Sequence, residues 1–419
     1  MKRYAIVGFG CAGYHAAKAI RSLDRTGEIH VFDRLNMPPF NPMLSTYYAS
    51  DRISLDGVFP FGNLDSLCSQ LDLQFHGGQT VSSISQNTLT LEDGSSYSFD
   101  AILVSTGARA LLPPLKGLPD SRVLVMRTLE DAERLRARLA SAPPRRAVVV
   151  GGSMVGIKVA ELLAARGVEV TIADGADWLF PLAAFPHVGR ELERRLTLRG
   201  LRFTWGAMVR EISPEGVVLT SGALLLADLI CLCIGTRAEA DTVSGPGCGV
   251  QVGRGIVVDN NMMTSCPGIY AAGDCCEGTE LQSGQTMPIG LWANAARQGE
   301  AAGRAMAGHP EPYAGNIIHN ITHFMGLDFV GLGDSRREGE PVVWGGLSAG
   351  PYIEARVRDG SLQCVNLLDC RRAAGILKSL LLAQLDRPGC GLTPVQTAAL
   401  LGCGISREFI RKIGGNRHV

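Results

Sequence analysis

One pattern of hydrophobic and polar positions occurs twice along the chain. Residues 3–33 and 146–174 each begin with an apolar, β-branched run, pass through a glycine-rich turn into a stretch with apolar residues at helical spacing, and end in a second apolar run closed by Asp. Such spacing is typical of a buried strand, an amphipathic helix and another strand. The repeat predicts the same strand–helix–strand unit in two places, with the first glycines, Gly8 and Gly151, 143 residues apart.

The remaining sequence predicts shorter elements around these two units. A helix with charged periodicity is expected over 129–139, closed by Pro143-Pro144, and an alanine-rich helix lies within 268–308. From Tyr313 onward the pattern changes to strands and then to helices that end near Ile413. The other expected strands are 95–99, 101–105, 217–219, 229–234, 329–332, 342–344 and 362–367.

The composition is that of a large folded protein. The 419 residues are enough for about three domains. Apolar residues make up 46% and charged residues 19% of the chain, which excludes a disordered or collagen-like protein. Forty basic residues balance forty acidic ones, so there is no basic field for nucleic acid. The basic runs 134–138 and 190–202 alternate with Glu and apolar residues and predict solvated helix faces.

Neither a targeting segment nor a metal site is expected. Glycines interrupt the N-terminal apolar run, which indicates a strand rather than a signal peptide. The most apolar stretch, 223–235, is about half the ~20 residues of a membrane helix. Twelve cysteines are too sparse for a disulfide scaffold and form no CxxC pair. His319 and His323 could share a helix face and bind metal, but the Ile and Phe residues around them favour a strand or a core helix, so we expect no metal. The sparse cysteines and the lack of a targeting segment predict a cytoplasmic protein.

The first glycine turn, Gly8-Phe9-Gly10-Cys11-Ala12-Gly13, fits the dinucleotide fingerprint in its required context. The first glycine permits the tight turn, the second admits the pyrophosphate, and the third lets the helix approach its strand. Phosphates then lie at a helix N-terminus, where free N–H groups favour anions. Asp33 follows Gly8 by 25 residues and can accept a hydrogen bond from a ribose hydroxyl. This turn therefore predicts nucleotide binding.

The second turn, Gly151-Gly152-Ser153-Met154-Val155-Gly156, has Ser at the middle position. A small side chain is tolerable there but displaces the pyrophosphate slightly outward. Asp174 ends the second strand and would repel a 2′-phosphate, and Gly175 and Ala176 offer no compensating cation. The turn predicts NAD rather than NADP, with a vestigial structural repeat as the alternative.

Together with 104–108 (VSTGA) and 268–274 (GIYAAGD), the two turns resemble the pyridine nucleotide–disulfide oxidoreductase superfamily over about residues 1–308. The resemblance implies an α/β fold of the glutathione reductase type, with two Rossmann-like dinucleotide-binding domains and a C-terminal α+β domain. It implies an FAD domain over 1–112 and 239–310, an NAD domain over 113–238, and a C-terminal interface domain over 311–419 that favours a homodimer. It also implies an FAD- and NAD(P)H-dependent oxidoreductase.

The resemblance assigns cofactor contacts residue by residue. It places the ADP half of FAD on the first fingerprint and Asp33, adenine against the backbone of Val81, the chain crossing at Thr106-Gly107, and the flavin ribityl chain or phosphate at Asp274. Trp292, at the start of the helix after that acid, would lie beside the isoalloxazine. The further expected contacts are Arg34, Leu44 and Gly273 for FAD, and Gly235 with the second fingerprint for NAD.

The segment 38–45 (PPFNPMLS) is most similar to the branch of ferredoxin, rubredoxin and nitrite reductase flavoproteins. That branch carries a Lys directly after Leu-Ser and a Glu two residues after the last glycine of the second turn, and the two pair near flavin N5. Here the positions hold Thr46 and Lys158. We therefore expect Lys158 to contact the N5/O4 edge of the flavin, with a solvated helix lysine as the alternative.

A thiol-mediated mechanism is not expected. Relatives that reduce disulfides carry a CxxxxC or CxxC pair, or one Cys within 41–45, and this chain has neither. Cys11, Cys275 and Cys276 are interpreted as packing residues. The sequence thus indicates electron transfer between nicotinamide and a redox partner, either a small iron–sulfur protein or a sister subunit. The alternatives are an NADH oxidase, a flavin dehydrogenase subunit acting on a small organic substrate, or a subunit whose NAD site is degenerate.

Overall fold

The structure is a computed structural model that describes residues 1–245, 248–348 and 350–414. Contacts divide the chain into two compact units. The first comprises Met1–Leu111, Arg127–Glu133 and Thr236–Asn316, and the second comprises Leu112–Met126, Arg134–Gly235 and Ile317–Val419. The sequence placed its boundaries after residues 112, 238 and 310, and the three domains that these four segments form stay a prediction.

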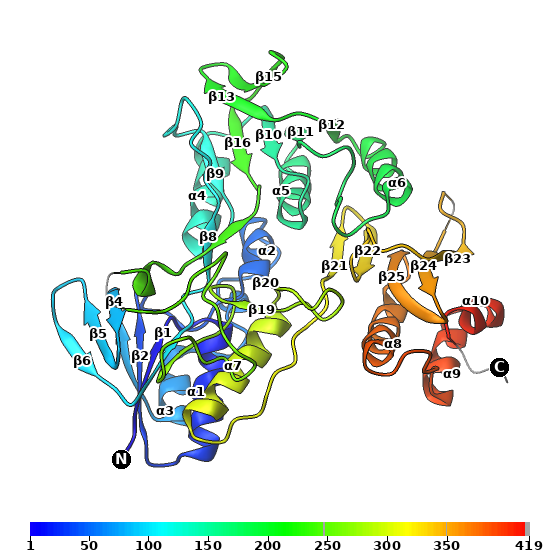
Figure 1. Cartoon of the computed structure of the whole chain (residues 1–419). Helices are drawn as coiled ribbons and strands as arrows, with labels where there is room; N and C mark the ends of the chain where they lie inside the picture. Colours follow the sequence, from blue (N-terminus) through cyan, green and yellow to red (C-terminus); the bar gives the residue numbers. More distant parts are fainter. Residues whose placement is uncertain (246–247, 349, 415–419) are drawn as a thin grey trace. The chain divides into compact units, whose positions relative to one another are not determined.

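The first unit is built on a parallel sheet with the strand order β18-β7-β1-β2-β3, of which Figure 1 labels β1 and β2. Its strands are Arg3–Val7 (β1), Glu28–Asp33 (β2), Leu73–Gly77 (β3), Ala101–Val104 (β7) and Ile269–Ala271 (β18). All four residues of β7 are buried, because both faces of a parallel sheet are covered. The first predicted strand–helix–strand unit is therefore confirmed.

Two helices, α1 (Cys11–Leu23) and α7 (Trp292–Met306), lie side by side in this unit (Figure 1). A side chain at Gly299 would overlap the Ala12 carbonyl, and one at Gly303 would overlap the Ala16 carbonyl. The small residues of both helices thus permit a close approach, which explains the alanine-rich pattern.

Smaller elements complete the first unit. The first unit also contains an antiparallel sheet, β4-β5-β6, and two strand pairs, β8 with β17 and β19 with β20. Their bounds are Val81–Ser85 (β4), Thr88–Leu91 (β5), Ser96–Ser98 (β6), Ala108–Ala110 (β8), Thr236–Ala238 (β17), Glu277–Thr279 (β19) and Thr286–Pro288 (β20). The two short helices are Ser45–Ala49 (α2) and Leu64–Leu71 (α3).

The second unit contains the repeat of that architecture. Its parallel sheet has the order β12-β11-β10-β16-β9, and a three-stranded meander, β13-β14-β15, adjoins it in sequence. The strands are Val123–Val125 (β9), Arg146–Val150 (β10), Glu169–Ala173 (β11), Arg202–Thr204 (β12), Val209–Ser213 (β13), Gly216–Leu219 (β14), Leu224–Leu226 (β15) and Leu229–Leu232 (β16). The helices are Met154–Ala164 (α5), Pro186–Thr197 (α6) and the larger part of Leu129–Ser141 (α4), whose first residues belong to the first unit.

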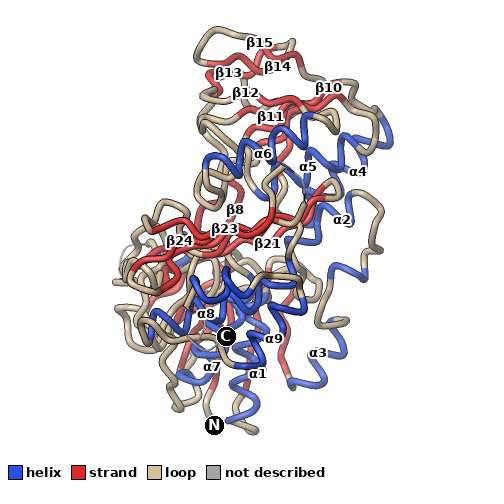
Figure 2. Tube along the Cα trace, turned by 90° about the vertical axis from the view of Figure 1, so that its right-hand side faces the viewer, coloured by secondary structure: helices blue, strands red, loops and turns tan. Residues whose placement is uncertain are grey.

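The C-terminal part of the second unit is an antiparallel sheet of order β21-β22-β25-β24-β23 with helices after it. Figure 2 shows α8 and α9 on one side of these strands. The bounds are His319–Phe324 (β21), Leu327–Leu332 (β22), Glu340–Gly345 (β23), Tyr352–Arg358 (β24), Ser361–Leu368 (β25), Ala374–Asp386 (α8), Pro394–Gly402 (α9) and Arg407–Lys412 (α10). His319 and His323 therefore lie on a strand, which confirms the strand alternative and excludes the helix. Within the described residues, no helix has the length and apolar character needed to cross a bilayer.

Candidate functional site

The first glycine turn forms a tight cradle at the carboxyl end of β1. Gly8 has a φ of +94°, and its N–H donates to the Phe32 carbonyl at 2.8 Å. A Cβ at Gly13 would overlap the Gly8 carbonyl oxygen, so only glycine lets α1 come this close to the turn. These two glycines have the structural roles that the fingerprint predicts.

The middle glycine of this turn faces open space. No atom lies within 4 Å of a Cβ built on Gly10. Gly10 is also the N-cap of α1, and no side chain caps the helix there. The first N–H groups of α1 therefore remain available to an anion, which is the arrangement that a pyrophosphate requires.

Asp33 stands beside this cradle at the end of β2. Its carboxylate accepts from the Phe9 N–H at 2.6 Å and from the Leu35 N–H at 2.8 Å. Burial raises the pKa of Asp33, and these two hydrogen bonds oppose that shift. Since each carboxylate oxygen carries two lone pairs, both can still accept from a ribose hydroxyl.

A cavity in the first unit extends along the cradle and joins segments that are distant in sequence. Arg127 lies in its wall and donates to Asp274 at 2.7 Å and to the Ala108 carbonyl at 3.0 Å. Sequence reasoning missed Arg127, because no motif surrounds it and its partner is 147 residues away. Of the predicted residues, those lining the cavity are Gly8, Gly10, Cys11, Ala12, Asp33, Arg34, Thr106, Gly107, Gly273, Asp274 and Trp292.

Trp292 stands at the start of α7 and forms one wall of the cavity. Its ring stacks on Phe61 with centroids 5.9 Å apart, and Phe61 stacks on Tyr14 at 4.0 Å. The contact to Phe61 was not foreseen from the sequence. This stack fixes the plane of the indole that faces the cavity.

Cys11 is the one cysteine among the described residues that line the cavity. Burial, together with the charge of Asp274, raises the pKa of its thiol to about 12. The thiol therefore stays protonated near neutral pH and is a poor nucleophile. Cys275 and Cys276 are fully buried in the core of the first unit. The interpretation of all three cysteines as packing residues stays a prediction.

Gly13 and three further predicted site residues lie outside the cavity lining. Thr46 is buried within α2, Leu44 directly follows the lining residues Pro42 and Met43, and Val81 is buried at the start of β4, where it pairs with Leu91. Their contacts with a cofactor stay predictions.

The second cradle repeats the hydrogen bonds of the first. Gly151 has a φ of +109° and donates to the Ala173 carbonyl at 2.8 Å, while a Cβ at Gly156 would overlap the Gly151 carbonyl. Asp174 accepts from the N–H groups of Gly152 and Ala176 at 2.6 and 2.8 Å. These contacts correspond to those of Gly8, Gly13 and Asp33, so the repeat extends from the sequence to the backbone geometry.

The cradles differ at the middle residue of the turn, which the fingerprint places against the phosphates. The Ser153 hydroxyl donates to the Cys233 carbonyl at 2.9 Å and accepts from the Gly156 N–H at 3.0 Å, so it caps α5. One helix N–H that is available in the first cradle is thus already used in the second. The indole of Trp205 also lies against Gly152, about 3.2 Å from where a Cβ would be.

Lys158 is held within the second unit by two partners. Its ammonium group pairs with Glu161 and donates to the His323 carbonyl at 2.9 Å. Glu161 in turn accepts from the Met325 N–H at 3.0 Å, so this pair holds the tip of the β21–β22 hairpin against α5. Both side chains are largely buried, with 11% and 8% exposed, which excludes the solvated helix lysine. Sequence analysis missed Glu161, because the resemblance to ferredoxin and rubredoxin reductases places their Glu at position 158, three residues earlier.

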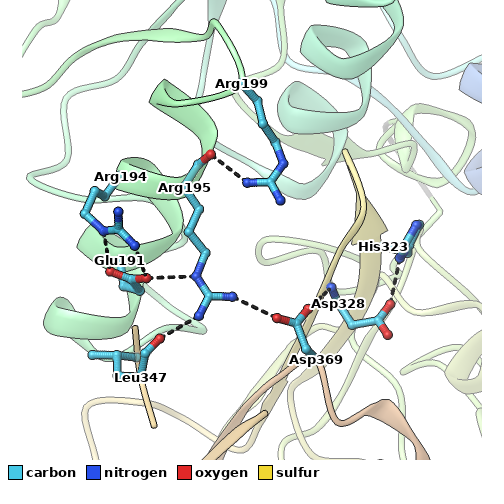
Figure 3. A network of polar contacts seen from close by, with 8 residues as sticks. All are labelled: Glu191, Arg194, Arg195, Arg199, His323, Asp328, Leu347 and Asp369. Atoms are coloured by element: carbon cyan, nitrogen blue, oxygen red, sulfur yellow. Dashed lines mark hydrogen bonds and ion pairs between the residues drawn. The ribbon is translucent and has the colours of Figure 1, made fainter. Parts of the chain in front are cut away.

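The basic run on α6 is also partly internal (Figure 3). Arg195 donates to Glu191 and Asp369, both at 2.8 Å, and to the Leu347 carbonyl at 2.6 Å. Its side chain is only 10% exposed, so the predicted solvated face is wrong at this position. Asp369 also accepts from the Asp328 N–H, and Asp328 pairs with His323 at 2.7 Å, which links α6 to the same hairpin.

Two dinucleotide cradles on repeated parallel sheets define a protein that binds dinucleotides. The family described as pyridine nucleotide-disulphide oxidoreductase matches residues 2–299, and the chain belongs to it. The chain is therefore an FAD-dependent NAD(H) oxidoreductase of the two-Rossmann-domain type, as the sequence predicts. The residues of the first cavity fit FAD, because the open middle glycine Gly10, the uncapped start of α1 and the acid Asp33 all belong to its lining.

Curated relatives cover nearly the whole chain. The chain is 29% identical over 407 residues to the NADH-dependent phenylglyoxylate dehydrogenase subunit epsilon of Aromatoleum evansii, covering 94% of each protein. It is 30% identical over 391 residues to the benzene 1,2-dioxygenase system ferredoxin–NAD(+) reductase subunit of Pseudomonas putida, covering 91% of this chain and 92% of the relative.

A solved structure supports the fold. The water-forming NADH oxidase of Lactobacillus brevis, bound to NADH, aligns with a TM-score of 0.84 at 20% identity, covering 99% of this chain and 97% of the oxidase. At this identity the likeness concerns the fold alone.

Proposed function

We propose that the chain is a reductase component that oxidises NADH and delivers the electrons to a separate acceptor protein. The acceptor is either a small iron–sulfur protein or another subunit of a redox complex. The relatives include a ferredoxin–NAD(+) reductase subunit and a subunit of an NADH-dependent dehydrogenase, which supports both forms of acceptor. When FAD is bound, it accepts a hydride and can release electrons one at a time.

The chemistry of Cys11 carries this proposal. A dithiol shuttle needs a thiolate near the flavin and a second thiol to resolve the exchange. Cys11 is protonated at neutral pH, since its pKa is raised to about 12, and no second cysteine belongs to the described lining. Electrons therefore leave this site for an acceptor outside the chain rather than for an internal disulfide.

The cavity residues have distinct roles in this proposal. The N–H groups at the start of α1 would hold the pyrophosphate of FAD, and Asp33 would accept from its adenosine ribose. Outside the cavity lining, Val81 would contact adenine through its backbone. Asp274, held by Arg127, accepts from the ribityl chain, and Trp292 excludes water from one side of the isoalloxazine. In the second cradle Asp174 binds the ribose of NADH and repels a 2′-phosphate.

An anaerobic experiment tests the proposal. NADH is mixed with the FAD-loaded protein, and the flavin band near ~450 nm is followed before a ferredoxin or a co-purified subunit is added. We expect NADH to bleach the band and the acceptor to restore it. Absence of bleaching with either NADH or NADPH would reject the nicotinamide half. Rapid turnover with oxygen alone would instead identify an oxidase.

We also include a homodimer and a cytoplasmic location in the proposal. The resemblance to the superfamily implies a C-terminal interface domain over 311–419, and the twelve free cysteines suit a reducing compartment. Sedimentation of the loaded protein measures the oligomeric state, and a monomer at micromolar concentration would remove the dimer from this account.

A further inference from the structure

Lys378 has surroundings unlike those of the other lysines. It lies on α8, among the buried residues Leu377, Leu380 and Leu381, and is itself half-buried. Its ammonium nitrogen stands 3.1 Å from Nε2 of His319, at the start of β21. In the described part of the chain, no carboxylate lies within ion-pair distance of this lysine, so no negative charge stabilises its ammonium form.

The contacts of His319 fix where its proton lies. Nδ1 of the ring is 3.1 Å from the Ile317 carbonyl, and only a protonated nitrogen can donate to that oxygen. Nε2 of the neutral ring therefore presents a lone pair to Lys378. Burial lowers the pKa of both groups, and the charge of Lys378 lowers the pKa of His319 further. The pair thus gives up its extra proton more readily than an exposed lysine does.

The other five lysines lack this arrangement. Lys116 and Lys412 pair with Glu211 and Glu408 at 3.0 and 2.7 Å, and Lys158 pairs with Glu161. Lys2 and Lys18 are exposed to water. A carboxylate partner or full hydration stabilises the ammonium form, which is not nucleophilic.

We infer that Lys378 is a modification site that accepts acyl groups from acyl phosphates or acyl thioesters, with His319 as its proton acceptor. Nζ attacks the acyl carbon and forms an N–C bond, while the bond from that carbon to the phosphate oxygen or thiol sulfur breaks. The amine proton passes to Nε2 of His319, and the phosphate or thiolate leaves. No electrons are exchanged with an outside reagent, so the step balances.

Acylation would also alter the local structure. The product amide carries no positive charge and one N–H, so the 3.1 Å contact to His319 is lost or weakened. His319 begins β21, and the other end of this strand carries the hairpin that Lys158 and Glu161 hold. Modification at Lys378 therefore acts on the strand that supports the second cradle.

The test compares lysines within one protein. The FAD-loaded protein is treated with acetyl phosphate or, in a second arm, acetyl coenzyme A, and the initial acetylation rate of each lysine is measured by mass spectrometry. We expect Lys378 to react at least about fivefold faster than Lys116, whose side chain is 84% exposed, in at least one arm. The arm that reacts identifies the acyl source.

Two variants and one unfolding control complete the experiment. His319→Gln should reduce the rate at Lys378 to that of Lys116 or below while leaving the other lysines unchanged, and Lys378→Arg should remove the signal. In urea the advantage of Lys378 should disappear, which tests the inference even where His319→Gln does not fold. Equal or slower reaction of Lys378 than of Lys116 in the native protein, in both arms, overturns the inference.

Discussion

The two cradles have the same backbone geometry but differ at the position where the fingerprint places the phosphates. Around Gly8 and Gly151 the same hydrogen bonds recur within 0.1 Å, including those of the two acids, Asp33 and Asp174. In the first cradle the helix N-terminus is open at Gly10, whereas in the second the Ser153 hydroxyl already caps it. An uncapped helix suits a cofactor that stays bound, and a capped helix is stable without its ligand, which suits a substrate that comes and goes.

The largest effects are expected from substituting the glycines that let each helix pack close to its turn. Gly13→Ala places a methyl group on the Gly8 carbonyl, and Gly156→Ala places one on the Gly151 carbonyl. Such backbone overlap should destabilise the affected unit by about 3 kcal/mol. We expect loss of bound flavin from Gly13→Ala and loss of NADH reactivity with retained flavin from Gly156→Ala, measured by flavin content and anaerobic reduction. Gly10→Ala, which meets no atom, is the control that should fold normally.

Glu191→Gln should have the next largest effect, on stability. Arg194 and Arg195 hold the pKa of Glu191 below its ordinary value, so its contribution is present above about pH 4.5 and is lost as the pH falls through the lowered value. We expect the variant to lose about 2–3 kcal/mol of unfolding free energy at pH 7, because it weakens a network around the buried Arg195.

Urea unfolding over a pH series measures this loss, and the difference from the parent protein should shrink below pH 4.5. Glu169→Gln is the matched control, since Glu169 and Arg202 form an exposed pair worth about 0.5 kcal/mol. A Glu191→Gln deficit that persists unchanged in acid would show that the charge of Glu191 is not its cause.

Lys158→Glu should weaken NADH binding at the second cradle and leave flavin binding at the first cradle unchanged. The substitution puts a carboxylate beside Glu161 and removes the donor to the His323 carbonyl, so the hairpin is released from α5. We expect the KM for NADH to rise about tenfold, equivalent to about 1.4 kcal/mol, while flavin content is unchanged. Lys116→Glu, a reversal at an exposed ion pair, should change the KM less than twofold. An unaltered KM for Lys158→Glu would limit the hairpin to a structural role.

Ser153→Gly should give the smallest effect and make the second cradle resemble the first. It frees the Gly156 N–H for the pyrophosphate at a cost of a few tenths of a kcal/mol, because glycine is a tolerated N-cap. We expect tighter NADH binding, by about threefold, in equilibrium titration. Weaker binding would instead assign the Ser153 hydroxyl a direct contact with the phosphates.

The sequence revealed those parts of the site that depend on local pattern. Gly8, Gly13 and Asp33 could be predicted, because the strand, turn and helix that carry them are neighbours along the chain. Gly8 and Asp33 are 25 residues apart. Arg127, Phe61 and Glu161 could not be predicted, since their contacts join segments without a motif. Arg195 was assigned to a solvated face because its partner, Asp369, is 174 residues away, and periodicity cannot show what a helix packs against.

Electron stoichiometry tests the central claim, that flavin works in this chain without a thiol partner. The FAD-loaded protein is titrated anaerobically with NADH, and free thiols are counted before and after under denaturing conditions. We predict that one NADH per FAD completes the bleaching and that the thiol count does not change. Uptake of two NADH per FAD together with two new thiols would contradict the account, because it would require a redox-active disulfide.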